Sequence, residues 1–173
     1  MASSCGDSSD GEDQPSTTEA WAGQVCSSAS DWLGAVSDAQ ASLTGTTNLN
    51  ADALGGAFDD IGSATETLVS DLGDLGAPDT EAGDEAHAQL SSLSEELQQQ
   101  RGVISTATAQ AAGSVQGLLA QVSTVTAAVA TMLSDIGKAI DNIRQLQGAD
   151  ELEKAFQDAS SCQDLRASAS PSA

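Results

Sequence analysis

The chain has 173 residues, about the size of one ordinary domain, so it is long enough to bury a core. Its 26 Asp and Glu residues stand against 5 Lys and Arg, for a formal net charge of -21. A surface this acidic repels the phosphates of nucleic acids and the head groups of anionic lipids. The composition therefore excludes both as primary partners.

The amino-acid composition predicts an all-α protein. There are two Trp, two Phe and no Tyr, whereas strands are rich in aromatic and β-branched residues. Ala, Leu and Gln are abundant and favour helices, and no proline occurs between residues 79 and 170. Residues 1–16 and 167–173 are mostly small or polar, so we expect a disordered tether, a helical bundle over 17–166 and a disordered tail.

The first two predicted helices have apolar residues at helical spacing. Ser16, Thr17, Thr18 and Glu19 have the spacing of a capping box, and a second helix is expected to begin after Asn50. The apolar stripe of the first helix comprises Trp21, Val25, Ala29, Trp32, Val36, Ala39 and Leu43. The heptad seam of the second comprises Leu54, Phe58, Ile61, Thr65, Leu68, Leu72 and Leu75.

A continuous heptad seam then extends over residues 80–147, with Asp79 placed to cap its start. One helix of this length would be roughly 100 Å long and would leave half of its seam unpaired. We therefore expect a turn within residues 111–114, followed by a short last helix capped by Asp150. The predicted fold is an antiparallel up-down-up-down four-helix bundle with a short fifth C-terminal helix.

Two of the three cysteines are predicted to pair. In the four-helix arrangement, Cys26 lies roughly 14 Å along the first helix, and Cys162 lies roughly 18 Å along a last helix that returns beside it. These similar heights favour a disulfide, which is typical of oxidising compartments. The alternative is a pair of buried free thiols in a cytosolic protein.

The third cysteine, Cys5, follows Ala2, Ser3 and Ser4 and precedes the polar tether. This arrangement resembles the maturation site of bacterial lipoproteins, although it lacks the leucine usual three residues before the cysteine. No apolar run precedes it, so we expect a signal peptide to be absent or already removed. The resemblance implies lipidation of Cys5 and an extracytoplasmic protein anchored to the cell membrane. The alternative is an incidental free thiol.

The composition is similar to that of secreted proteins of high-GC Gram-positive bacteria. Trp21-Ala22-Gly23 and Trp32-Leu33-Gly34 resemble the W-x-G motif of type VII secretion substrates. Both tryptophans, however, belong to the apolar stripe of the first helix. We therefore interpret them as core residues.

No residue pattern predicts catalysis or a cofactor. The only histidine, His87, shares a helix face with Asp84, but one histidine beside exposed carboxylates is a poor metal-ligand set. Acidic residues at the start of a helix are better explained by the helix dipole. We expect no enzyme activity, no metal and no cofactor.

Residues 102–134 contain no charged side chain. Many Ser, Thr and Gln residues make this segment too polar for a typical membrane span, so we expect it to be the most enclosed part of the bundle. The alternative is a hairpin that inserts into membranes, as in helical pore-forming toxins.

The sequence thus predicts a non-catalytic, membrane-tethered envelope lipoprotein that acts as an acidic helical interaction or structural module. Its partner would be an envelope protein or another cell-surface component. The alternative is a secreted helical effector or pore-forming protein that uses residues 102–134.

Overall fold

The computed structural model describes residues 17–45, 51–110 and 114–169, and all secondary structure in these ranges is helical. The predicted all-α class is therefore confirmed. The helices are α1 (Thr17–Gly45), α2 (Ala51–Asp74), α3 (Gly83–Ala109), α4 (Val115–Arg144), α5 (Asp150–Asp158) and α6 (Ser160–Ala169).

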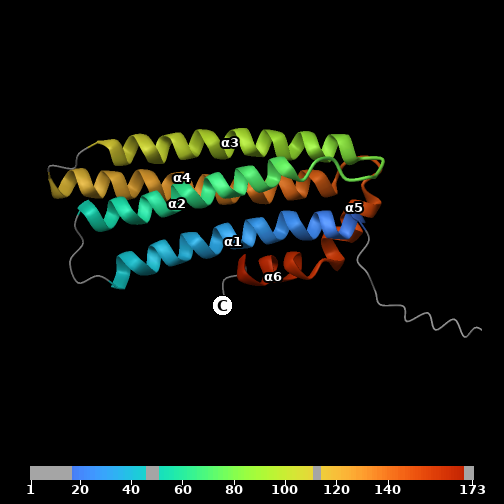
Figure 1. The fold of residues 1–173 in the computed structure, drawn as a ribbon, viewed down its shortest axis with the longest axis horizontal. Helices are drawn as coiled ribbons and strands as arrows, with labels where there is room; N and C mark the ends of the chain where they lie inside the picture. The colour runs from blue at the N-terminus through green and yellow to red at the C-terminus, as the bar shows by residue number, and fades with distance from the viewer. Residues whose placement is uncertain (1–16, 46–50, 111–113, 170–173) are drawn as a thin grey trace, which may run out of the picture.

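The four long helices lie side by side along the long axis of the molecule, α5 lies at one end, and α6 runs from that end back along α1 (Figure 1). Helix α2 packs against α1 and α3, and α3 packs against α4. Helices α5 and α6 cover α1, and α5 also contacts α4. The start of α1 and the end of α4 therefore meet at α5. The ring of Trp21 contacts that of Phe156, and the Arg144 guanidinium lies 3.8 Å from the Glu153 carboxylate.

The core forms from the predicted apolar stripes of α1, α2 and α3. The largest side chains with almost no exposure include Trp32 from α1, Leu68 from α2, Leu97 from α3, Met132 from α4 and Phe156 from α5. In α4, however, the buried residues begin only at Val125. The first third of this helix therefore contributes no buried side chain to the core.

A buried hydrogen bond links α1 to α2 inside this core. Thr65 has 0% exposure, and its hydroxyl accepts a hydrogen bond of 3.0 Å from the indole N–H of Trp32. The same hydroxyl donates to the carbonyl oxygen of Ile61 at 2.8 Å, and the Met132 sulfur lies 3.8 Å away. Thr65 thus supplies a hydrogen-bond acceptor for a buried indole N–H that would otherwise have none.

The predicted division of residues 80–147 into two helices is confirmed, whereas most of the predicted turn lies outside the described residues. Helix α3 ends at Ala109 and α4 begins at Val115, while residues 111–113 lie outside the described ranges. Ser114 is the N-cap of α4, and its hydroxyl accepts a hydrogen bond of 3.2 Å from the N–H of Gly117. A serine N-cap satisfies a backbone donor that has no partner within the helix.

Two predicted helix caps are wrong. The N-cap of α3 is Ala82 rather than Asp79, and that of α5 is Ala149 rather than Asp150; neither makes a side-chain cap hydrogen bond. Before α3 the chain instead turns tightly over Pro78. Gly83 is needed at this turn, because a Cβ atom there would overlap the Pro78 carbonyl oxygen.

The last predicted helix is divided in two. Ala159 has extended backbone (φ -61°, ψ 121°), which ends α5 and lets α6 start in a new direction at Ser160. Helix α6 then runs along α1 and continues to Ala169, three residues into the predicted tail. The break at Ala159 therefore directs the end of the chain onto α1.

Candidate functional site

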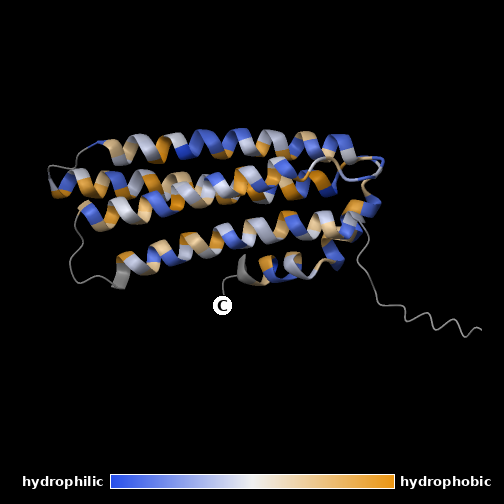
Figure 2. Ribbon diagram, in the orientation of Figure 1, coloured by the Kyte–Doolittle hydropathy of each residue, from blue (hydrophilic) through white to orange (hydrophobic). Residues whose placement is uncertain are grey.

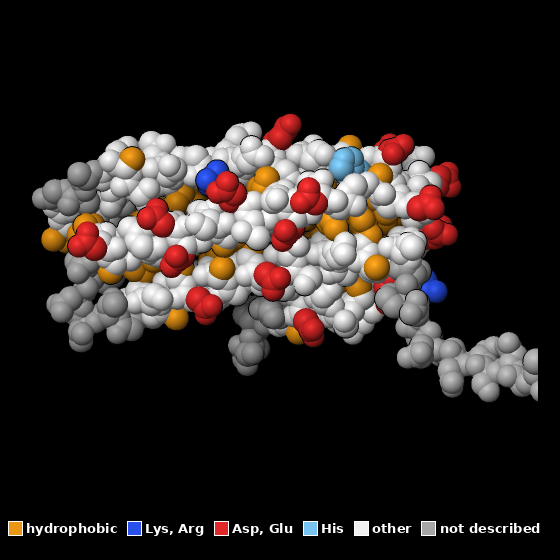
Figure 3. All heavy atoms as spheres, in the orientation of Figure 1, with side chains coloured by type: hydrophobic (Ala, Val, Ile, Leu, Met, Phe, Trp, Pro, Cys, Tyr) orange, Lys and Arg blue, Asp and Glu red, His pale blue; other side chains and the backbone are white. Residues whose placement is uncertain are grey.

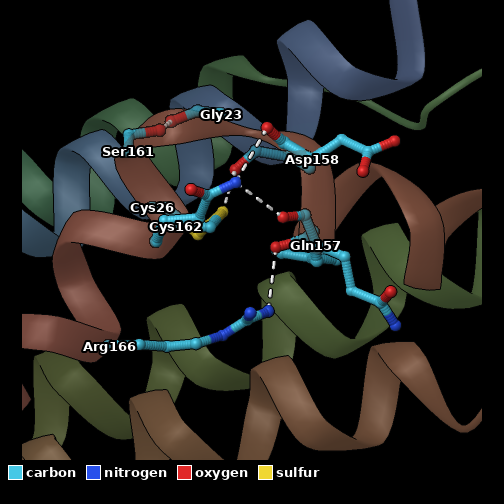
Figure 4. The surroundings of a disulfide bond; sticks show 10 residues. Gly23, Cys26, Gln157, Asp158, Ser161, Cys162 and Arg166 are labelled. Atoms are coloured by element: carbon cyan, nitrogen blue, oxygen red, sulfur yellow. Dashed lines mark hydrogen bonds between the residues drawn. A yellow bond between two sulfur atoms is a disulfide. The ribbon is translucent and has the colours of Figure 1, made fainter.

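The disulfide end of the molecule comprises the start of α1, the α2–α3 connection, α5 and α6. Here Cys26 of α1 and Cys162 of α6 form a disulfide with a Cα–Cα distance of 4.9 Å (Figure 4). Their sequence separation is 136 residues, and their exposures are 1% and 2%. The structure thus brings together the pair predicted from the sequence.

Hydrogen bonds beside the disulfide hold α6 against α1 and α5. The Ser161 hydroxyl donates to the Gly23 carbonyl oxygen at 2.7 Å, and the Arg166 guanidinium donates to the Phe156 carbonyl oxygen at 2.9 Å (Figure 4). Sequence reasoning missed both contacts. No spacing rule links residues this far apart, because the partners meet only once α6 has turned at Ala159.

The two tryptophans of the W-x-G motifs are core residues, as predicted. Trp21 is 6% exposed and Trp32 is 2% exposed. Trp21 packs edge to face on Phe156 with ring centroids 6.0 Å apart, and its indole N–H donates to the Gly76 carbonyl oxygen at 3.1 Å. These contacts connect α1 with α5 and with the α2–α3 connection.

The acidic residues near His87 do not gather around it. Asp84 and Glu85 are exposed on the same helix, and His87 is half-buried. Among the described residues, no group of three or more His, Cys, Asp or Glu side chains is arranged to hold a metal ion. Cys5, the predicted lipidation site, lies outside the described residues.

The predicted enclosure of residues 102–134 is wrong. The exposed large hydrophobic residues of the described part of the chain all lie in this segment: Val103 (43%), Val115 (73%), Leu119 (64%) and Leu133 (41%). None of residues 115–124 is buried. We call residues 102–110 and 114–124, where α3 ends and α4 begins, the uncharged tip.

Local hydrogen bonding explains why the lack of charge did not indicate burial. Thr106 donates to the Gly102 carbonyl oxygen at 2.8 Å, and Thr124 donates to that of Ala120 at 2.9 Å. Both side chains are exposed. Hydroxyl groups therefore supply the polar surface that charged residues supply elsewhere.

A groove of about 620 Å³ lies between α3 and α4 at the uncharged tip. The Gln121 side-chain amide donates across it to the Ala107 carbonyl oxygen at 2.8 Å and also contacts the Gln110 carbonyl oxygen. No charged side chain lines the groove: the lining residues are Gln99, Gly102, Val103, Thr106, Ala107, Gln110, Gly117, Ala120, Gln121 and Thr124. Such a lining offers packing and neutral hydrogen bonds, but no acid–base pair for catalysis.

The surface charge differs between the long helices. Acidic side chains are spread over the face shown in Figure 3, and α1, α2 and α3 each contain more acidic than basic residues. Helix α4 instead has Asp135 and Asp141 against Lys138 and Arg144. Each of these basic residues lies near an acidic one, at 3.3 Å for Lys138–Asp135 and 3.8 Å for Arg144–Asp141. Among the long helices that the structure describes, α4 alone therefore has balanced charge.

Helix α4 is also the most apolar long element in the described ranges. Figure 2 shows hydrophobic residues recurring along its length. By length and composition alone it is the one described helix that qualifies as a candidate membrane span, and only 22% of the qualifying 18-residue window is buried. No protein-family model, curated protein or solved structure matches this chain.

Proposed function

We propose that this chain is the non-catalytic ectodomain of a cell-envelope lipoprotein, anchored to the membrane through a lipid on Cys5. Its helical part, which we propose to be an antiparallel up-down-up-down four-helix bundle, acts as an acidic interaction or structural module. Its partner is another component of the cell surface.

The observation that carries this proposal is the opposite placement of the disulfide end and the uncharged tip. The helical part begins at Thr17, and Trp21 lies against α5 at the disulfide end. A lipid on Cys5 would therefore hold that end near the membrane. The exposed hydrophobic residues Val115 and Leu119 lie at the start of α4, at the other end of the long helices. A tethered protein with this layout presents its uncharged tip away from its own membrane.

The disulfide and the charge distribution support the same proposal. A buried disulfide is typical of exported proteins, because thiols in the cytosol are kept reduced. A net charge of -21 keeps the protein soluble and repels anionic head groups, so a lipid is a more suitable anchor than the protein surface.

Detergent partitioning of the native protein tests the anchor. Expressed from its complete gene in its own host, the protein should partition into the detergent phase and begin at a lipid-modified Cys5. The Cys5→Ser variant is the matched control and should remain in the aqueous phase. Aqueous recovery of the unsubstituted protein with an alkylatable Cys5 would disprove the lipoprotein assignment.

A second candidate function is that of a secreted pore-forming protein using residues 102–134. It is favoured by the length and hydropathy of α4 and by the low burial of its most apolar window. Dye leakage from phosphatidylcholine liposomes treated with the Cys5→Ser protein distinguishes the two functions. The pore-forming candidate requires leakage, whereas an interaction module leaves the liposomes intact.

A further inference from the structure

Helix α4 has a second, mostly apolar face that the described helices cover only in part: Val122 and Ile140 pack against the edge of the core, whereas the large side chains of Val115, Leu119 and Leu133 are exposed. Its members recur at steps of four, three, four, seven and seven residues, and we call them the outer seam: Val115, Leu119, Val122, Thr126, Leu133 and Ile140. At 3.6 residues per turn, these positions lie within about 60° of one another around the helix. Val115, Leu119, Thr126 and Leu133 are exposed, while Val122 and Ile140 are half-buried.

The outer seam is distinct from the face of α4 that packs into the core. The buried residues of α4 are Val125, Ala128, Val129, Met132, Ile136, Ala139 and Ile143. Their average direction is about 90° from that of the outer seam. The groove at the tip is lined by Gly117, Ala120, Gln121 and Thr124, which lie on the side of α4 toward α3 and away from the outer seam.

The spacing of the outer seam indicates the shape of its occupant. Apolar residues repeated at heptad positions along a helix pack against another helix, because they stay on one side over many turns. From Val115 to Ile140 the seam extends roughly 38 Å along a helix about 10 Å wide. The occupant should therefore be a long apolar helix face rather than a small ligand.

The charges of the long helices favour a helix from a second copy of this chain over a helix from a basic partner. A basic partner would be drawn to the acidic residues of α1, α2 and α3, not to a seam whose N-terminal two thirds has no charge. Two copies of this chain repel each other wherever those acidic helices face one another. They do not repel along α4, where Asp135 and Asp141 are balanced by Lys138 and Arg144.

We propose that the outer seam of α4 binds the outer seam of α4 in a second copy of this chain, forming a two-fold symmetric dimer. This contact covers Val115, Leu119 and Leu133 at once in both copies. This proposal rests on the interaction role proposed above and identifies the partner in that role as a second copy of the chain. It does not depend on the lipid anchor.

The size of the seam predicts a weak dimer. Its footprint is about 400 Å² per copy, roughly half of the area each partner buries in a standard protein interface. We therefore expect a Kd of about 1 to 100 µM. Because the apolar contact works against repulsion between two chains of charge -21, added salt should strengthen the dimer.

Sedimentation equilibrium of the full-length Cys5→Ser protein tests the proposal, since this variant carries no lipid and has no thiol free to link two copies. We expect a reversible monomer–dimer equilibrium that shifts toward dimer with added NaCl. A protein that stays monomeric up to near-millimolar concentration, or a dimer that dissociates in salt, would refute the proposal.

Two matched substitutions locate the contact. Leu133 lies in the outer seam and Val103 lies on α3, yet their exposures are 41% and 43% and both belong to the uncharged segment. Leu133→Glu should weaken the dimer at least about tenfold, because it places a like charge from each copy in an apolar contact. Val103→Glu should leave the association unchanged. Equal loss in both variants would show that α4 is not the contact.

Leu119→Glu provides a second test that does not depend on core packing. The side chain is 64% exposed, so this variant should keep the helicity and melting temperature of the parent protein. It should nevertheless be monomeric. Binding of phosphatidylcholine vesicles by a parent protein that stays monomeric would assign the seam to a membrane and overturn the dimer.

Discussion

The disulfide end and the uncharged tip differ in how their residues are held. At the disulfide end, a covalent bond, an aromatic pair and hydrogen bonds from Trp21, Ser161 and Arg166 join α1, α5, α6 and the α2–α3 connection. At the tip, α4 begins with residues 115–124, none of which is buried. One end of the molecule is thus held by a disulfide and by contacts between different helices, while the other end exposes large apolar side chains such as Val115 and Leu119.

This difference separates the cross-linked end of the molecule from the end with exposed apolar residues. Long-range contacts at the disulfide end stabilise the fold but leave little apolar surface for a partner. The α4 part of the tip keeps a helical backbone but contains no buried side chain, so its exposed residues can be substituted without opening the core. Substitutions at the disulfide end should therefore lower the free energy of unfolding, whereas substitutions of exposed α4 residues should leave it nearly unchanged.

The largest loss of stability is expected at the disulfide. Replacing both cysteines in Cys26→Ala/Cys162→Ala should lower the free energy of unfolding by about 2 to 5 kcal/mol, because the cross-link closes a loop of well over a hundred residues in the unfolded chain. Urea denaturation measures the loss, and circular dichroism should still show a helical protein because the core seams remain.

Cys5→Ser is the control for this substitution and should unfold like the parent protein. Peptide mapping without reductant should recover Cys26 linked to Cys162 and Cys5 outside that link. Finding Cys5 in a disulfide with either one would contradict the arrangement of the disulfide end.

A smaller loss is expected at the buried hydrogen bond between α1 and α2. Thr65→Val keeps the side-chain shape but leaves the Trp32 indole N–H without its acceptor, which should cost about 1 to 3 kcal/mol in unfolding free energy. Thr67→Val is the matched control, since Thr67 is exposed and its hydroxyl bonds only to the Ser63 carbonyl oxygen of its own helix. Equal effects in the two variants would mean that the Trp32–Thr65 bond does not stabilise the core.

The smallest effect is expected at the tip. Leu119→Ala should change the unfolding free energy of the monomer by less than about 0.5 kcal/mol, because the side chain is 64% exposed. Leu97→Ala, which removes a side chain with 0% exposure, should cost about 2 to 5 kcal/mol in the same urea titration. A large loss from Leu119→Ala would show that the tip belongs to the stabilising core and would remove the contrast between the two ends.

Local features of the fold could be predicted from the sequence because they depend on residues close together in the chain. Composition alone predicted an all-helical protein, and apolar spacing located the buried faces of α1, α2 and α3. The turn after Ala109 was predicted from the length of the seam, since a helix too long for its neighbours leaves apolar surface unpaired. The Cys26–Cys162 pair followed from the same reasoning about helix lengths.

Tertiary structure alone decided which of residues 102–134 are buried and which are exposed. Their lack of charge predicted burial, but burial depends on which helices lie beside a segment, and no described helix covers the outer face of α4 at Leu119 and Leu133. The break at Ala159 could not be predicted from the sequence either, because alanine favours helix. The extended backbone of this residue is explained only by the packing of α6 against α1. Periodicity determines which residues share a face of a helix, whereas the placement of neighbouring helices decides whether that face is buried or exposed.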